Sequence, residues 1–204
     1  MFLSILSVLF CFIVLTANIM AVKMIDVSCF TLPAAVFCYP FCFVLGDLLT
    51  EFHGFKTARK IVLLTFLVNA LSVGLLSLAA VLPPSQYYQH NDAFRVVFLN
   101  TPRIVGASFA AFVLSGIFNS YLFAFIKRHG HPLLVRSSVS TFFGVILDST
   151  VFITLAFVGK LPTNILLLTI LGQILAKIFV GICIGTPLTW LIVRIINRYI
   201  RRSA

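Results

Sequence analysis

The chain has 204 residues, of which 61% are hydrophobic and 10% charged, with a formal net charge of +10 and a mean hydropathy of +1.13. A soluble domain of this size exposes too much surface to tolerate such a composition, and no polar stretch is long enough for a separate soluble enzyme or nucleic-acid-binding module. The composition predicts an integral membrane protein with one domain, residues 1–204. Its basic residues are expected to face lipid headgroups rather than nucleic acid.

Six apolar segments follow one another along the chain and predict an all-α bundle of six transmembrane helices. Each is long enough to cross a bilayer at 1.5 Å per residue. Pro40 is expected to kink the second helix, Gly54 to end it and Pro187 to bend the last. A polar loop is expected over residues 85–100. The predicted spans are residues 2–22, 32–51, 60–82, 102–126, 135–158 and 164–196.

The basic residues in the loops and near the ends of the spans are distributed unequally between the two sides of the predicted bundle. Ten lie on the side of the two termini and four on the other, and Lys177 lies within the last span. Because cytoplasmic segments carry the excess of Lys and Arg, both termini are predicted to be cytoplasmic, in a bacterial inner membrane. The ten are Lys56, Arg59, Lys60, Lys127, Arg128, Arg136, Arg194, Arg198, Arg201 and Arg202; the four are Lys23, Arg95, Arg103 and Lys160.

The second predicted helix carries two carboxylates inside an apolar segment. Asp47 and Glu51 are four residues apart and share a helix face with Thr50, with Phe43 one turn away. A carboxylate in the bilayer core is disfavoured by about 2.5 to 3.5 kcal/mol on insertion scales. The pattern indicates a face turned towards a polar interior, although Glu51 also lies close enough to Arg59 to form a surface pair.

Four more helices carry polar residues at helical spacing, which indicates a bundle around a polar interior. Ser and Thr in such helices often bond their own backbone, and Asp148 and Lys177 have the alternative of neutralising each other. The positions are Thr65, Asn69 and Ser72; Ser108, Ser115 and Asn119; Thr141, Gly144 and Asp148; and Thr169, Gln173, Lys177, Gly181 and Gly185.

Sequence signatures of an enzyme are missing. There is no HExxH or GxSxG motif, and the five cysteines have neither metal-ligand nor disulfide-framework spacing. An aspartyl dyad of Asp47 and Asp148 would make an intramembrane hydrolase and stays as a minor alternative. The prediction is a transport protein that needs no metal or other cofactor.

Several short motifs resemble those of the bacterial queuosine-precursor transporters, a six-helix family similar in fold to the vitamin-binding S-components of energy-coupling-factor transporters. The resemblance covers almost the whole chain, and the string Gly46-Asp47-Leu48-Leu49-Thr50-Glu51-Phe52-His53-Gly54-Phe55 is its most specific part. One departure is Val145, where the family often has Gln. The other matching positions are Ala17-Asn18, Ala21-Val22-Lys23, Pro40, Thr101-Pro102-Arg103, Asn119-Ser120, Arg136, Ser140-Thr141, Leu147-Asp148-Ser149, Lys177 and Thr186-Pro187-Leu188-Thr189.

The resemblance implies import of a 7-deazaguanine: the cyano or aminomethyl precursor base, or queuine. A guanine-like edge offers N1–H and an amino group to a carboxylate, its O6 accepts from an amide or a cation, and its face stacks on an aromatic ring. The expected substrate-binding residues are Asn18, Phe43, Asp47, Thr50, Glu51, Arg103, Asn119, Asp148, Gln173 and Lys177.

Two classes of transport protein remain open at this point. One is a self-sufficient importer of a purine-like base; the other is an S-component that captures a vitamin or base and needs a separate ATP-driven module. The partners expected are the small-molecule substrate and the lipid bilayer, without nucleic acid, and a homodimer is left open.

Overall fold

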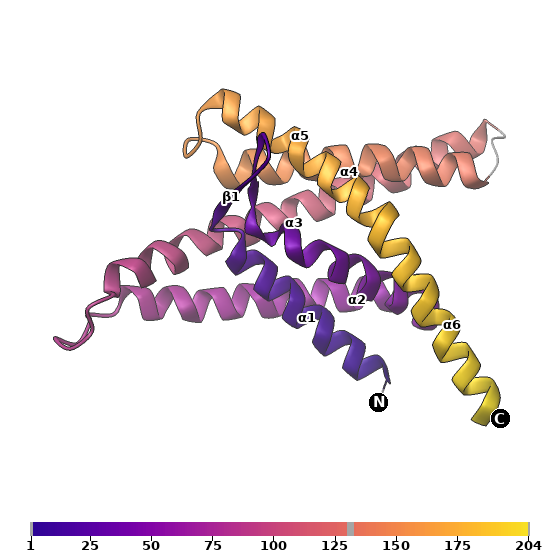
Figure 1. Ribbon diagram of the computed structural model, residues 1–204, viewed down its shortest axis with the longest axis horizontal. Helices are drawn as coiled ribbons and strands as arrows, with labels where there is room; N and C mark the ends of the chain where they lie inside the picture. Colours follow the sequence, from indigo (N-terminus) through magenta and orange to yellow (C-terminus); the bar gives the residue numbers. More distant parts are fainter. Residues whose placement is uncertain (1, 130–132, 204) are drawn as a thin grey trace.

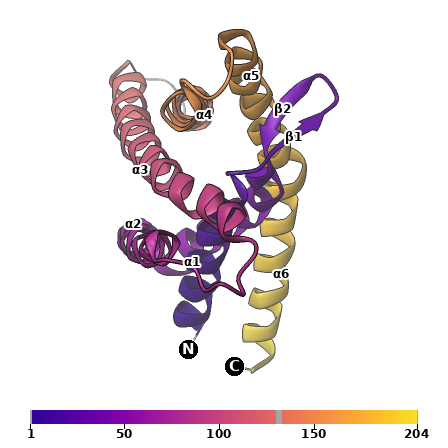
Figure 2. The same ribbon diagram turned by 90° about the vertical axis from the view of Figure 1, so that its left-hand side faces the viewer.

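The computed structural model describes residues 2–129 and 133–203, and it is helical apart from one short β-hairpin and two loops. Figures 1 and 2 show the arrangement; α1 begins and α6 ends at the same end of the molecule in both views. The elements are α1 (Phe2–Met20), β1 (Met24–Val27), β2 (Phe30–Pro33), a 3₁₀ helix (Ala34–Cys38), α2 (Tyr39–Val81), α3 (Asn91–Arg128), α4 (Leu133–Phe157), α5 (Thr163–Val180), a π-helical segment (Gly181–Gly185) and α6 (Thr186–Ser203).

Five helical stretches among the described residues are long and apolar enough to cross a membrane, where the sequence predicted six. The difference lies in α2, because the second and third predicted spans form one helical stretch that changes direction at Gly54. Gly54 has φ +77° and ψ 159°, a backbone region that is essentially restricted to glycine. The expectation that Gly54 ends a helix is therefore confirmed, and two arms, residues 39–53 and 55–81, meet there without a loop.

The contacts of α1 show that the first arm of α2 is antiparallel to it. The Phe2 ring lies 5.4 Å from the ring of Phe52, centroid to centroid. At the other end of α1, the Cys38 thiol lies 3.7 Å from the Met20 sulfur. The start of α1 thus meets the end of this arm.

The second arm runs parallel to α1, so the two arms are antiparallel to each other. Ala58 belongs to the same buried cluster as Leu6 near the start of α1. Near the end of α1, the amide nitrogen of Asn18 donates to Asn69 Oδ1 at 3.1 Å. Both amides are almost completely buried, so this bond fixes the position of the second arm along the length of α1.

The predicted start of the second helix at residue 32 is wrong. Residues 24–33 form an antiparallel hairpin in which Met24 pairs with Pro33 and Val27 with Phe30. Pro40 also differs from the expectation of a kink, because it lies in the first turn of α2, where its missing N–H has no helical partner to lose. The hairpin was overlooked because two strands of four residues give only a short alternation beside an apolar run.

The hairpin packs against α5 through one close contact. A Cβ atom on Gly172 would lie 2.8 Å from the side chain of Phe30, so the absence of a side chain at Gly172 creates the space for this ring. Gly172 and its neighbour Gln173 are both buried. The contact fixes the hairpin over α5 at the end of the bundle where α1 terminates.

The helices α3 and α4 pack together as an antiparallel pair, seen at the upper right of Figure 1. The polar loop predicted over residues 85–100 is shorter than expected, because α3 begins at Asn91 and includes Pro102. Arg103 links the pair: its Nε donates to the carbonyl oxygen of Leu155 at 2.7 Å, and a terminal nitrogen donates to that of Val158 at 2.6 Å. A cation at the C-terminal carbonyls of α4 also favours the helix dipole.

At the predicted bend, the helix is irregular just before Pro187. The π-helical segment Gly181–Gly185 directly precedes α6, in which Pro187 is the second residue. Pro187 has no N–H and its ring would collide with the carbonyl four residues earlier, Cys183, in a regular helix. A π turn widens the backbone at this point. The segment also brings Gly185 against Phe43, whose Cβ lies 3.5 Å from the place of a Gly185 Cβ.

Candidate functional site

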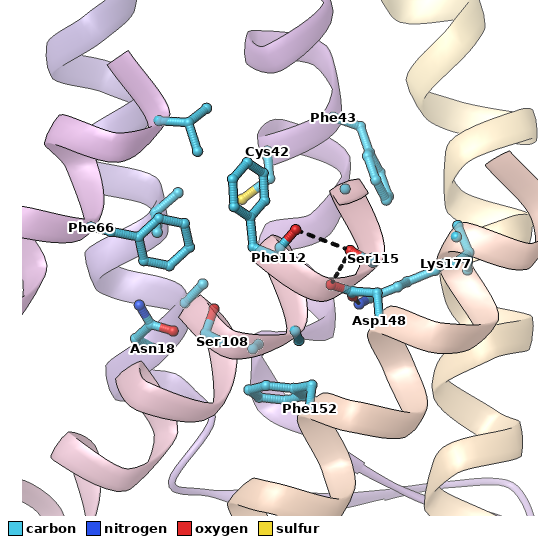
Figure 3. Close-up of a pocket in the computed structure, with 18 of the residues that line it drawn as sticks. Asn18, Cys42, Phe43, Phe66, Ser108, Phe112, Ser115, Asp148, Phe152 and Lys177 are labelled. Carbon is cyan, nitrogen blue, oxygen red and sulfur yellow. Dashed lines mark hydrogen bonds and ion pairs between the residues drawn. The ribbon is translucent and has the colours of Figure 1, made fainter. Parts of the chain in front are cut away.

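A cavity of about 420 Å³ lies between α1, both arms of α2, α3, α4 and α5. Its volume falls within the range of small-molecule sites, about 300 to 1,000 Å³. Figure 3 shows Phe66, Phe112, Phe152 and Phe43 around it, with Asp148 and Lys177 along one side. The cavity wall is therefore mostly apolar, with several phenylalanine rings and a few polar groups facing inward.

Six of the ten predicted binding residues line this cavity: Asn18, Phe43, Asn119, Asp148, Gln173 and Lys177. They come from five helices, so residues distant in sequence converge on one space. Thr65, Ser108, Ser115 and Thr141, which lie in the predicted polar stripes, also line it.

The four other predicted residues lie outside the cavity lining. Asp47 is exposed on the first arm of α2 and accepts a 3.4 Å hydrogen bond from Thr189 of α6. Thr50 donates to the carbonyl of Gly46 in its own helix, and Glu51 is exposed. Arg103, as described above, caps α4. The face that carried the most conspicuous sequence motif is thus turned towards α6 and the outside of the described fold.

An ion pair between Asp148 and Lys177 forms the charged part of the cavity wall. Lys177 Nζ donates to Asp148 Oδ2, which joins α4 to α5. The Lys177 side chain is 11% exposed and that of Asp148 26%, so the carboxylate is the more accessible partner. Among the described residues, the other oxygen, Oδ1, accepts one long bond, 3.4 Å from Ser115, drawn in Figure 3. The mutual neutralisation left open by the sequence is therefore observed, and Oδ1 is held weakly.

Gln173 supplies the clearest indication of a ligand. Its side chain is 1% exposed, and neither its amide oxygen nor its amide nitrogen has a hydrogen-bond partner among the described residues. An unpaired polar group in the interior costs about 1 to 3 kcal/mol, so native proteins rarely keep one without a function. A ligand with an adjacent donor and acceptor would satisfy both atoms of this amide.

Asn119 presents a second unpaired group. Its Oδ1 is buried and has no partner in the part of the chain that the structure describes. The side chain lies against Gly144, where a Cβ would be 3.5 Å from Asn119 Cβ. Gly144 thus makes room for this amide on α3.

The aromatic part of the site was not predicted apart from Phe43. Phe112 lies three residues before Ser115, Phe152 lies four residues after Asp148, and Phe66 directly follows Thr65. For Phe112 and Phe152, helical spacing to a polar position could have identified the ring as part of the cavity wall. The signal was weak because the chain has 22 Phe residues, and many of them have such a spacing. Cys42, interpreted from its sequence as a packing residue, also lines the cavity.

Comparison with known proteins shows which family the chain belongs to. The family described as "Putative vitamin uptake transporter" matches residues 33–192, which is most of the chain. The chain belongs to this family. It is also similar to the "Probable queuosine precursor transporter" of Bacillus subtilis (strain 168), with 25% identity over 174 residues that cover 84% of this chain and 76% of the relative.

The family assignment confirms the resemblance that the sequence motifs indicated. It makes the chain a multi-pass membrane transport protein and not an enzyme, as predicted. No solved structure gives a significant match to the chain. The expected similarity to S-components therefore stays a prediction.

Proposed function

We propose that this transporter imports a 7-deazaguanine queuosine precursor and that the cavity between α1 and α5 is its binding site. The observation that carries the proposal is the buried Gln173 amide, whose two polar atoms both lack a partner among the described residues. The printed name of the Bacillus subtilis relative supports the same substrate class.

The lactam edge of a guanine-like base complements such an amide. Its N1–H donates to Gln173 Oε1, and Gln173 Nε2 donates to O6, which gives a two-point contact. The N1–H and O6 of the base, which leave water, then each gain a partner, which limits the cost of desolvation. The pairing discriminates against apolar molecules of the same shape, because those would leave the Gln173 amide unpaired.

The faces of the base would be held by the surrounding rings. Phe43, Phe66, Phe112 and Phe152 line the cavity, and a planar heterocycle stacks favourably on aromatic side chains. A mostly apolar wall that includes aromatic rings and a few placed polar groups is typical of small-molecule binding sites.

We further propose six crossings of the bacterial inner membrane, with both termini cytoplasmic. The two arms of α2 are antiparallel, which would make each a separate crossing, and the charge distribution of the sequence favours a cytoplasmic end for the termini. Reporter fusions at the C-terminus and at the hairpin tip test this; activity of the C-terminal reporter only outside the cytoplasm would contradict it.

The deciding experiment is uptake of labelled 7-deazaguanines by the purified chain in liposomes. Uptake above that of empty liposomes, reduced about tenfold by Gln173→Leu, is expected, because the variant removes a donor and an acceptor from the site. Thr150→Val is a matched control, since the Thr150 hydroxyl bonds the carbonyl of Ile146 in its own helix and does not line the cavity.

The same assay distinguishes a self-sufficient importer from an S-component that needs an ATP-driven module. Binding without uptake by the chain alone, restored by an ATP-driven partner, would assign it to the S-component class. Absence of both binding and uptake for every 7-deazaguanine would refute the proposed substrate.

A further inference from the structure

The α2–α6 seam, residues 43–51 and 185–193, is the line along which α6 packs on the first arm of α2. It begins at the cavity wall, because Phe43 lines the cavity and its Cβ lies 3.5 Å from the position that a Cβ of Gly185 would take. Four residues further along both segments, Thr189 donates to Asp47 Oδ2 at 3.4 Å. The two segments therefore run parallel, towards the end of the molecule where α1 begins and α6 ends in Figure 1.

Phe43 belongs both to the cavity wall and to the seam. Figure 3 shows its ring among the side chains that line the cavity. Gly185, at the end of the π-helical segment, is buried and contacts the same residue from the side of α6. The Phe43 ring thus closes the cavity at the point where the seam begins.

Beyond Phe43 the first arm carries polar side chains along the seam. Thr50 and Glu51 share the helix face of Asp47, and all three are exposed in the described fold. Asp47 is seven residues from the corner at Gly54, about 10 Å along the helix. A carboxylate at that depth is unfavourable against lipid, and such groups in membrane helices mark the pathways of substrates and ions. The seam therefore offers polar groups from the cavity wall to the end of the arm.

The helix α6 is held less firmly than the other side of the arm. Among the side chains described in α6, none is buried, and Leu188, Ile192 and Val193 are only partly buried against a cluster from α1 and α2. The π-helical segment Gly181–Gly185 joins α6 to α5, and such segments are common sites of kinks. Elements with few buried contacts move at a lower free-energy cost than the core. A turn of α6 about this segment would leave the cluster of α1 and α2 intact.

We propose that substrate leaves the cavity through the α2–α6 seam, towards the side of the two termini, and that the segment Gly181–Gly185 is the hinge that opens it. As α6 turns, Gly185 moves away from Phe43, and the ring no longer closes the cavity. Asp47 and Glu51 then accept hydrogen bonds from the departing molecule, so they influence the rate of transport and not the affinity of the cavity. This inference rests on the transport role in the proposed function, and not on which base is carried.

A reversible link across the seam tests the proposal. Asp47→Cys and Thr189→Cys are combined in a chain whose five native cysteines are replaced by alanine, and a short thiol-reactive cross-linker joins the pair in proteoliposomes. Uptake of labelled 7-deazaguanines is compared between the linked and the reduced form of the same protein, so any effect of the substitutions cancels. The link is expected to slow uptake by about tenfold or more, reversibly, and to change substrate binding in detergent by less than about twofold.

The matched control links the same arm to α1 instead of α6. The rings of Phe2 and Phe52 lie 5.4 Å apart, so Phe2→Cys with Phe52→Cys provides the pair. Because α1 and the arm stay together when α6 turns, this link is expected to change uptake by less than about twofold. Unchanged uptake with the link between residues 47 and 189, or equal inhibition by both links, overturns the inference while import stands.

A second measurement needs no substrate and tolerates failure of the cysteine-free chain to transport. Asp47→His and Thr189→His are combined in a chain that keeps only Cys42, which lines the cavity. Zn²⁺ bridges two neighbouring imidazoles, and it is expected to slow the reaction of Cys42 with an impermeant thiol reagent added from the side of the termini, with Asp47→His alone as the control. An equal rate with and without Zn²⁺ overturns the inference. If no 7-deazaguanine is taken up by the wild type, the proposed substrate fails, and this labelling rate decides the role of the seam by itself.

Discussion

The ion pair between Asp148 and Lys177 allows a quantitative prediction. At an effective dielectric constant of 20, two unit charges in hydrogen-bond contact attract each other by about 4 to 5 kcal/mol. Removal of both groups from water offsets most of this, so the intact pair contributes little net stability. Removal of one partner leaves the other charge buried without compensation, at a cost of about 3 to 5 kcal/mol when the site is fully buried.

The exposure of this pair lowers that figure. Because 26% of the Asp148 side chain remains accessible, we expect Asp148→Asn and Lys177→Met each to lower the free energy of unfolding by about 2 to 3 kcal/mol. The double variant removes both charges, so it should lose only about 1 kcal/mol. The coupling energy in the double-mutant cycle is then about 3 to 5 kcal/mol.

The cycle is measured by unfolding of the purified variants in mixed detergent micelles, followed by circular dichroism. Ser115→Ala is the matched control, because it removes only a hydroxyl that makes long bonds, 3.4 Å to Asp148 Oδ1 and 3.3 Å to the carbonyl oxygen of Phe112, and should change the stability by less than about 0.5 kcal/mol. Additivity of the two single variants within about 0.5 kcal/mol would refute the reasoning. A double variant that transports normally would show that the pair is structural and does not contact the substrate.

Three further predictions follow from positions around the cavity. Gly172→Ala places a Cβ 2.8 Å from Phe30 and should destabilise the protein by about 1 to 3 kcal/mol, whereas Gly74→Ala, with open space around it, should be neutral or stabilising; thermal unfolding of the two variants checks this. Arg103→Met removes two bonds to carbonyls at the end of α4, so thermal stability should fall by about 1 to 3 kcal/mol while substrate affinity stays within twofold; a selective loss of affinity would instead place Arg103 at the substrate. Asp47→Asn should change substrate affinity by less than twofold because Asp47 does not line the cavity, and a tenfold loss in a binding assay would return Asp47 to the substrate site.

The sequence alone determined the class of the protein and the position of most helices. The apolar runs had to become helices, because a backbone in lipid must satisfy its own hydrogen bonds. The polar positions at helical spacing also identified four of the six predicted binding residues that line the cavity, because Asn119, Asp148, Gln173 and Lys177 follow the periodicity of their helices. Gly54 was readable as a helix end because only glycine adopts its backbone conformation without strain.

Only the tertiary structure decided which way each polar face is turned. Asp47 and Asp148 have the same sequence signature, a carboxylate within an apolar helix, yet Asp148 lines the cavity and Asp47 contacts Thr189 of α6. Periodicity defines a face of a helix but not its rotation within a bundle, because that depends on packing against neighbours distant in sequence. The contact between Phe30 and Gly172 also depends on the tertiary structure, because an isolated two-stranded hairpin is marginally stable at best and this one packs against α5.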